Sequence, residues 1–349
     1  MPPKLNIDAT AHSPTIGLIL HYGQILYNAW AGDAVQLSAS VVGTLLIGYV
    51  VAQLGLSVWS FIRPSKIQGY CHSETGSWAL VTGASDGIGR AFVDELLDRG
   101  FNVLLHGRNP EKLERIQKEL AQKYPRRNIH FVVADASRSD HPETAVIEKV
   151  QQLPGKLTVL VNNVGGIPTT PTLLELRKTE AAAIDAQINV NARFPTQLIA
   201  ALLPTLRQNQ PSLILNCGSG GGIIGAPFIA TYVATKAYIH TLTLALKAEM
   251  AAEGYAPDKK YISGVEVQGF IIGNTRSAGN KAEMPFFTIS AAECAKGCLA
   301  KVGSGKALEL PHWRQALQMG IASLVPEKYM RGFLASEMKK RKMEQDKEQ

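Results

Sequence analysis

The sequence predicts an α/β fold: a doubly wound parallel sheet of Rossmann type in a single main domain, preceded by an N-terminal transmembrane anchor. Short apolar runs alternate with helical stretches from Ser77 onward, a glycine-rich turn joins the first run to the first helix, and an uncharged stretch precedes both. We therefore expect an anchor region over residues 1–66, with its span at about 38–62, the sheet domain over 77–325 and a charged tail over 326–349.

Composition narrows the class of protein. The 349 residues are 46% hydrophobic and 19% charged, which favours a globular core over disorder. The net charge is +7, but basic residues cluster only at "KKRK", Lys339–Lys342. This pattern indicates a solvated tail or a membrane-surface contact, and no nucleic-acid partner is expected. The four cysteines lack zinc-ligand spacing, so we expect no metal site and a reducing, cytosol-facing compartment.

The anchor is predicted from an absence of charge. No charged residue occurs between Asp33 and Arg63, and the most apolar part, Ser40–Trp59, would span roughly 30 Å as a helix. The following "RPSK", Arg63–Lys66, suits a cytosolic border. The alternative is a buried soluble helix. The earlier stretch Pro14–Trp30 is apolar but interrupted by polar residues, so it is either an interfacial helix or part of the same anchor.

The sheet domain begins with alternating strands and helices. Ile88–Arg99 reads as a helix between the first and second expected strands. Pro110–Tyr124 reads as a helix between the second and third, with Asn109 as its N-cap. Alternation of this kind implies parallel strands joined by right-handed crossovers. The expected strands are Trp78–Thr82, Phe101–His106, Ile129–Ala134, Leu157–Val161, Leu213–Cys217 and Tyr261–Val267.

The turn "TGASDGIG", Thr82–Gly89, follows the first strand and opens the first helix. Gly83 allows a sharp turn, Gly87 allows the backbone to approach a pyrophosphate, and Gly89 allows close packing of helix on sheet. The helix N-terminus offers free N–H groups to phosphates. We count Ser85 and Ile88 of the same turn with these glycines as cofactor-binding residues.

The strand ends indicate which nucleotide binds. Arg108 follows the second strand where a carboxylate would select NAD, and a guanidinium there suits the 2′-phosphate of NADP(H). The alternative is an ordinary surface arginine. Asp135 follows the third strand and is expected at the adenine edge. Asn162 opens "NNVG", Asn162–Gly165, after the fourth strand and is expected to line the adenosine side.

A candidate proton-transfer group follows the fifth strand. Tyr232 and Lys236 lie four residues apart, on one face of a helix, and Ser219 precedes the tyrosine by thirteen residues. An unperturbed phenol titrates at about pH 10, but a neighbouring ammonium and an oxidised nicotinamide stabilise phenolate. Tyr232 is therefore predicted to exchange a proton with a carbonyl oxygen that Ser219 also binds, while Lys236 holds the nicotinamide ribose.

Together these motifs resemble the short-chain dehydrogenase/reductase family over roughly residues 77–310. The resemblance rests on "TGASDGIG", "NNVG", Ser219 and "YVATK". It implies hydride delivery from NADPH, with Tyr232 as proton donor, Ser219 as orienting group and Lys236 as the group that stabilises phenolate. It also implies a fourth catalytic residue, an asparagine. We assign Asn191 rather than Asn189, because Asn191 lies thirteen residues before Pro204.

Longer stretches resemble the membrane-bound very-long-chain 3-oxoacyl-CoA reductase and 17β-hydroxysteroid dehydrogenase group: "FIRPSKIQGY", "WALVTGASDGIGRAF" and "RGFNVLLHGRNPEKLE". This resemblance implies a lipid-like substrate, an acyl-CoA or a steroid. It also implies an endoplasmic-reticulum membrane with the catalytic domain facing the cytosol, and partners in an elongation complex. A homodimer through the helices after the fourth and fifth strands is implied by the wider family. The apolar "MPFFTI", Met284–Ile289, occupies the usual substrate-loop region.

Three departures keep alternatives open. Gly218 precedes Ser219 where the family usually has a second serine, and "VQGFIIGNT", Val267–Thr275, replaces a proline–glycine turn that normally contacts the nicotinamide amide. Thr275, at the end of this segment, is the residue that we expect to contact the cofactor there. The C-terminus also lacks a dilysine signal. The alternatives are a reductase of a steroid or another hydrophobic ketone, and a catalytically weak lipid-binding or scaffold paralogue.

Overall fold

The computed structural model describes residues 14–72, 76–168, 170–258, 260, 263–277, 280 and 284–347, in two compact units that divide between Ile62 and Arg63. The first unit is one helix, α1, which runs from Pro14 to Ile62. Its part from Gly17 onward is long and apolar enough to cross a membrane. The undecided stretch Pro14–Trp30 thus belongs to the same helix as the predicted span. Its 49 residues extend roughly 70 Å, more than twice a bilayer core of about 30 Å.

The second unit is built on seven parallel strands in the order β3-β2-β1-β4-β5-β6-β9. This confirms the doubly wound fold, and its central strands are buried on both faces as a covered parallel sheet requires. The strands are β1 (Ser77–Thr82), β2 (Asn102–Gly107), β3 (Ile129–Val133), β4 (Lys156–Asn162), β5 (Ser212–Cys217), β6 (Val265–Phe270) and β9 (Leu308–Glu309).

Two strand predictions need revision. The sixth strand begins at Val265, whereas the sequence suggested Tyr261, and Tyr261 and Ile262 lie outside the described residues. The seventh strand, β9, was not expected. Only two of its residues pair with β6, and a pair this short leaves no alternation to detect.

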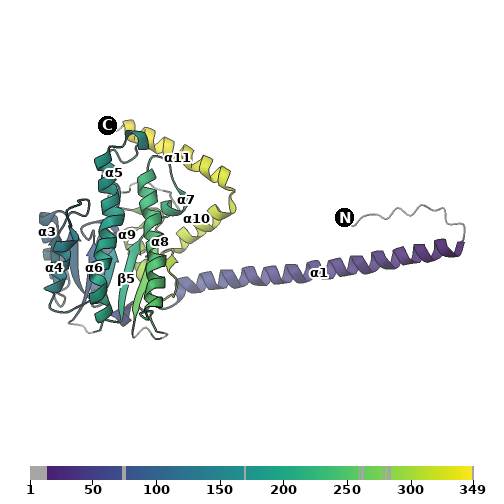
Figure 1. Cartoon of the computed structure of the whole chain (residues 1–349), viewed down its shortest axis with the longest axis horizontal. Coiled ribbons are helices and arrows are strands. Elements are labelled where there is room, and N and C mark those ends of the chain that lie inside the picture. Colours follow the sequence, from purple (N-terminus) through teal and green to yellow (C-terminus); the bar gives the residue numbers. More distant parts are fainter. Residues whose placement is uncertain are drawn as a thin grey trace. The chain divides into compact units, whose positions relative to one another are not determined.

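Helices cover both faces of the sheet (Figure 1). One apolar core lies under α2 (Gly87–Asp98), α3 (Pro110–Lys123) and α9 (Ala291–Lys301). The other core lies under α4 (Glu143–Gln151), α6 (Phe194–Gln208) and α8 (Ala230–Ala252). The shorter elements are η1 (Ile67–Tyr70), η2 (Leu176–Lys178), α5 (Ala181–Ile188), the π-helical turn η3 (Asn189–Arg193), α7 (Gly221–Ile224), β7 (Thr275–Arg276) and β8 (Ile289–Ser290).

The C-terminal part forms two further helices, α10 (Trp313–Leu324) and α11 (Glu327–Lys347), drawn in yellow in Figure 1. The expected charged tail is thus helical over most of its length. Charge pairs four residues apart support the helix, such as Lys342 with Asp346 at 2.8 Å. The far end is attached to the unit, because Oε1 of Gln345 accepts hydrogen bonds from the N–H groups of Thr172 and Leu173 at 3.1 and 3.0 Å.

The strand order locates the chemistry. It reverses between β1 and β4, and in open α/β sheets ligands bind beyond the carboxyl ends of the strands at such a reversal. The predicted glycine turn follows β1, and the "NNVG" segment follows β4. The two motifs therefore meet at the edge of the sheet where a dinucleotide would bind.

Candidate active site

The turn between β1 and α2 has the geometry that its glycines require. Gly83 and Gly87 have φ angles of +65° and +53°, a region that side chains disfavour. A Cβ atom on Gly89 would lie 2.1 Å from the carbonyl oxygen of Gly83, so the helix approaches the turn too closely for any side chain there. Ser85 and Ile88 are partly buried in the same turn. Asp86 caps α2 by accepting the Gly87 N–H at 2.7 Å.

The turn is held by a residue that the sequence analysis did not assign, Asn163. Its Nδ2 donates to the carbonyl of Thr82 at 3.0 Å, and its backbone N–H donates to Oγ1 of Thr82 at 2.9 Å. Its neighbour Asn162 is buried and donates across the sheet to Oδ1 of Asn216 at 3.0 Å. Of the two asparagines in "NNVG", Asn163 thus stabilises the glycine turn and Asn162 links β4 to β5.

The residues expected around the nucleotide lie along the same edge. Arg108, directly after β2, is exposed, as an arginine that binds a phosphate must be. Asp135 after β3 is half-buried, and its Oδ1 accepts hydrogen bonds from the backbone N–H and the hydroxyl of Ser137 at 3.0 and 2.8 Å. A positive side chain beyond β2 and an open glycine turn beyond β1 fit a dinucleotide with a phosphorylated ribose.

Gly165 brings two candidate catalytic side chains together. A Cβ atom on Gly165 would lie 2.8 Å from Oδ1 of Asn191 and 2.9 Å from Nζ of Lys236. Gly165 itself is exposed, so both side chains lie beside an open surface. Lys236 is only 6% exposed, and its ammonium donates to the carbonyl of Cys217 at 3.0 Å. The same ammonium lies 5.8 Å from the ring centroid of Tyr232.

Asn191 lies in the π-helical turn η3, a type of local widening that is frequent at functional sites. Its Nδ2 donates to the carbonyls of Gly166 and Gln187 at 2.7 and 2.9 Å, and its Oδ1 accepts the Gly166 N–H at 2.9 Å. Asn189 faces elsewhere, donating to the carbonyl of Ser137 at 3.1 Å. The geometry therefore favours Asn191 over Asn189 as the asparagine beside Lys236.

Ser219 follows β5 at the start of a glycine run that packs on α8. Its Oγ accepts the Gly221 N–H at 3.2 Å. A Cβ atom on Gly221 would lie 3.1 Å from Val233, the residue after Tyr232, and one on Gly222 would lie 2.7 Å from the backbone nitrogen of Ala237. The glycines thus allow α7 to lie directly against the helix that carries Tyr232.

The segment that replaces the proline–glycine turn is organised by Gln315 of α10, which sequence reasoning missed. The amide of this fully buried residue accepts the Gly273 N–H at 3.1 Å and donates to the carbonyl of Asn274 at 3.2 Å and to Oγ1 of Thr275 at 3.4 Å. Thr275 is buried and also donates to the carbonyl of Gly273 at 3.2 Å. No local pattern links Gln315 to this turn, because forty residues separate them.

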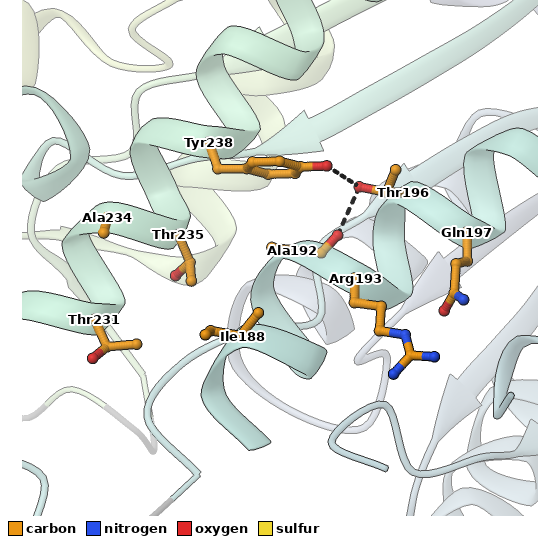
Figure 2. A pocket seen from close by; sticks show the side chains of 9 residues that line it. All are labelled: Ile188, Ala192, Arg193, Thr196, Gln197, Thr231, Ala234, Thr235 and Tyr238. Carbon is orange, nitrogen blue, oxygen red and sulfur yellow. Dashed lines mark hydrogen bonds between the residues drawn. The ribbon is translucent and has the colours of Figure 1, made fainter. Parts of the chain in front are cut away.

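Helix α8 has a second, more open face. A pocket of about 480 Å³ lies between α8 and the α5–η3–α6 segment (Figure 2). Tyr238 reaches across to Thr196, their hydroxyl groups lying 3.0 Å apart, and Ile188 and Tyr238 are exposed. None of the four candidate catalytic residues lines this pocket. The lining residues are Ile188, Ala192, Arg193, Thr196, Gln197, Thr231, Ala234, Thr235 and Tyr238.

Within the described part of the chain, no group of three or more His, Cys, Asp and Glu side chains is placed to hold a metal ion. Cys294 and Cys298 are buried in the core, as packing residues. The arrangement around Gly165 instead brings together the amide of Asn191 and the ammonium of Lys236, with the ring of Tyr232 near the same ammonium. An ammonium beside a phenol can stabilise phenolate and so assist proton transfer.

Comparisons with known proteins agree with this geometry. A model of the short chain dehydrogenase family matches residues 77–283. A very-long-chain 3-oxoacyl-CoA reductase of Coprinopsis cinerea is 37% identical over 58% of each chain, so this match spans under two thirds of that relative. A reductase of the same name from Lodderomyces elongisporus is 33% identical over 74% of this chain and 73% of its own.

The chain is also similar to a hydroxysteroid dehydrogenase-like protein and to a solved short-chain dehydrogenase. Hydroxysteroid dehydrogenase-like protein 1 of Gallus gallus is 30% identical over 72% of this chain and 73% of its own. A short-chain dehydrogenase from Sphingobium yanoikuyae, solved with NADPH, superimposes with a TM-score of 0.59 at 23% identity, covering 73% of this chain and 95% of its own. The fold, the glycine turn and the matched residues lead to one conclusion: the chain belongs to the short-chain dehydrogenase family.

Proposed function

We propose that the protein reduces a ketone on a long-chain lipid with NADPH, and that its substrate is a 3-oxoacyl-CoA, which becomes the 3-hydroxyacyl-CoA. The observation that carries this proposal is the convergence of Asn191 and Lys236 on Gly165, with Tyr232 beside the same ammonium. Two relatives named very-long-chain 3-oxoacyl-CoA reductase, at 37% and 33% identity, support the substrate class.

In this proposal each side chain has one task. Tyr232 donates its phenolic proton to the carbonyl oxygen, and the ammonium of Lys236 stabilises the phenolate that remains. Ser219 orients the carbonyl by a hydrogen bond to the same oxygen. Asn191 holds a water that returns a proton towards Lys236. NADPH, when bound, supplies the hydride.

The cofactor assignment rests on Arg108. Its exposed guanidinium after β2 suits the 2′-phosphate of NADPH, and its sequence neighbours Gly107 and Asn109 carry no carboxylate to bind a free ribose hydroxyl. We expect Arg108→Ala to raise the KM for NADPH at least tenfold while leaving the KM for NADH unchanged. Equal effects on the two cofactors would contradict a phosphate-binding role.

A hydrophobic substrate is supported by apolar side chains in and around the segment between β7 and β8. Phe286 is half-exposed and packs edge-to-face on Trp313 at 5.8 Å between ring centroids. The guanidinium of Arg314 lies 5.7 Å from the ring of Phe286. An apolar surface beside a cation suits an acyl chain attached to an anionic CoA.

We also propose that the protein is membrane-bound. Helix α1 supplies the span, and Arg63, the next residue, is fixed to the catalytic unit by hydrogen bonds to the carbonyls of Lys301, Val302 and Gly303 at 2.6 to 3.0 Å. By resemblance, the membrane is the endoplasmic reticulum, the catalytic unit faces the cytosol, and the partners are other enzymes of acyl elongation.

A surface of α10 would suit the same membrane. Trp313, Leu317, Ile321 and Leu324 recur on one helical face, and all are exposed, Leu324 by 84%. Such a face, with Arg314 at its start, is typical of a helix that rests in a lipid interface.

The open face of α8 suits a second copy of this chain. The apolar pocket of Figure 2 lies between the helices after β4 and β5, the pair through which members of the family associate. We therefore propose a homodimer with Tyr238 and Ile188 at its interface.

The runner-up function is reduction of a steroid or another hydrophobic ketone. It is favoured by the resemblance to hydroxysteroid dehydrogenase-like protein 1 and needs no change in the chemistry. A scaffold without activity is the second alternative, and it is favoured only by the rebuilt turn at Gly273–Thr275.

The test is NADPH oxidation by detergent-solubilised full-length protein. A chain-length series of 3-oxoacyl-CoAs is compared with one steroid ketone, in the wild type and in Tyr232→Phe. We expect rates that rise with acyl length and vanish in Tyr232→Phe, whose NADPH binding is unchanged. Turnover of the steroid alone would establish the runner-up, and failure of the protein to bind NADPH would favour the scaffold.

A further inference from the structure

The loop that carries Ser219 is tied to the sheet on one side. The N–H of Gly218 donates to the carbonyl of Phe270 at 2.9 Å, and the N–H of Gly220 donates to the carbonyl of Ile272 at 2.9 Å. Both acceptors lie at the end of β6 or just beyond it. These bonds flank Ser219 and leave its own N–H without a partner from the sheet.

Helix α8 supplies the remaining ties. Lys236 binds the carbonyl of Cys217, as described above, and one turn later His240 presents its ring to the loop. Nε2 of His240 lies 3.3 Å from the backbone nitrogen of Ser219 and accepts its N–H. His240 is therefore the side chain that holds the backbone of Ser219 itself.

Gly218 and His240 fit as a pair. A Cβ atom on Gly218 would lie 2.1 Å from Nε2 and 2.4 Å from Cδ2 of His240. The imidazole thus fills the space that a side chain at position 218 would need. Where the family usually has a serine, this chain thus has a glycine packed against one buried ring of α8.

The hydrogen bond requires a neutral ring. His240 is 6% exposed, and burial, together with the charge of Lys236, lowers the pKa of its imidazole below the ordinary value. A neutral imidazole whose proton is on Nδ1 leaves Nε2 as the acceptor that the Ser219 N–H needs.

We propose that His240 is a positioning residue, whose Nε2 fixes the backbone of Ser219 and so aims the serine hydroxyl at the substrate carbonyl. This inference rests on the proposed ketone reduction, in which Ser219 binds that oxygen. His240 does not touch the substrate. The positioning ring occupies most of the side-chain space at Gly218, and the carbonyl oxygen of Phe270 would lie 2.9 Å from a Cβ atom there.

The first test compares His240→Leu with His240→Gln, whose amide oxygen can reach the place of Nε2. We expect His240→Leu to lower kcat on the order of tenfold, with the Kd for NADPH unchanged, and His240→Gln to recover most of the loss. Thr243→Val is the matched control. Thr243 lies on the same helix as His240, and the substitution removes a buried hydrogen bond that Asn216 of β5 donates to the threonine hydroxyl, outside the loop. An equal loss of kcat in Thr243→Val would overturn the positioning role.

The second test is a double-mutant cycle. Gly218→Ala should lower kcat more than His240→Ala does, because the added methyl group collides with the ring. The double variant Gly218→Ala/His240→Ala should be more active than Gly218→Ala alone. Additive losses, or a harmless Gly218→Ala, would contradict the pairing.

Amide hydrogen exchange separates this inference from the proposed function. Peptides that cover residues 213–224 should exchange faster in His240→Leu than in the wild type or in His240→Gln, whatever substrate the enzyme turns over. Unchanged exchange in His240→Leu would overturn the inference even if the reductase activity is confirmed. Faster exchange without turnover of any ketone would retain the contact and refute the function.

Discussion

Two loops beside the candidate active site depart from the family's pattern, and they are held in different ways. The loop at Cys217–Gly220 is filled by a ring: His240 occupies the space beside Gly218 at 2.1 Å from a hypothetical Cβ. The loop at Gly273–Thr275 is held by an amide: Gln315 makes three hydrogen bonds to it at 3.1 to 3.4 Å. In both, a buried polar side chain from a later helix stands in for a local sequence feature.

The two loops should therefore tolerate different substitutions. The first loop has no spare volume, so adding atoms to Gly218 should harm it more than removing a hydrogen bond. The second depends on the amide of Gln315, which is fully buried, and a buried polar group left without its partner costs about 1–3 kcal/mol. The first loop is therefore sensitive to size and the second to polarity.

The largest expected effect comes from the ammonium that ties the first loop to α8. Lys236→Met keeps the length of the side chain but removes the charge near Tyr232 and the donor to Cys217. We expect kcat to fall about 10²–10⁴-fold, as for loss of a proton-transfer partner. Stopped-flow NADPH oxidation would measure it, and a loss below tenfold would show that the first loop does not need Lys236.

The next effect concerns the second loop. Gln315→Met preserves volume and removes all three hydrogen bonds, so we expect the KM for NADPH to rise on the order of tenfold, with a smaller change in kcat. Gln318→Met is the control, since Gln318 lies on the same helix and its side-chain amide donates to the sulfur of Met284 at 3.4 Å, outside the second loop. If both variants behave alike, α10 acts through general packing and the contrast between the loops disappears.

A pH titration should separate the loops, because a titratable ring is hydrogen-bonded directly to the first, whereas the amide of Gln315 is bonded directly to the second. The pKa of His240 is lowered by burial and by Lys236, so the stability due to its neutral form is fully present above about pH 6.5. That stability is lost as the pH falls through the lowered folded value. We expect exchange of the first loop, corrected for intrinsic rates, to rise at acid pH while that of Gly273–Thr275 does not.

His240→Gln supplies the control for this titration. The variant should lose the extra acid sensitivity of the first loop. Burial also lowers the pKa of the His106 imidazole, to about 4, so His106 likewise destabilises the fold as the pH falls. Because His106 is present in both proteins, its effect cancels. An identical pH response in wild type and variant would remove His240 from the explanation.

The smallest expected effect lies away from both loops. Gln345→Ala removes the hydrogen bonds from the end of α11 to Thr172 and Leu173, two backbone donors near the surface. We expect faster exchange over residues 340–347, at most about 1 kcal/mol of lost stability, and no change in the KM for NADPH. A change in cofactor affinity would mean that α11 also supports one of the two loops.

The sequence predicted the fold well because the signals for it are local. Apolar runs such as Leu157–Val161, the capping by Asn109 and the positive φ of Gly83 each follow from a few neighbouring residues. The choice of Asn191 over Asn189 also came from spacing, and the structure places Asn191 beside Lys236 through Gly165. The residue roles in catalysis and cofactor binding stay predictions until they are measured.

What the sequence did not predict depends on contacts between distant segments. Gln315 meets Gly273 across some forty residues, and only folding reveals the pair. His240 was closer to detection, since it follows Lys236 by one helical turn, but its partner Gly218 looked like a simple loss. The helical form of α11 was missed because a run of charges suggests solvation before it suggests pairs four residues apart.

The most direct test of the central claim is isotope transfer in one turnover. Full-length protein is mixed with a long-chain 3-oxoacyl-CoA and NADPH deuterated at C4 on the transferred face, and the product is analysed by mass spectrometry. We expect a 3-hydroxyacyl-CoA with one deuterium at C3 from the wild type and none from Tyr232→Phe. An unlabelled substrate recovered from wild-type protein that binds NADPH would contradict the account.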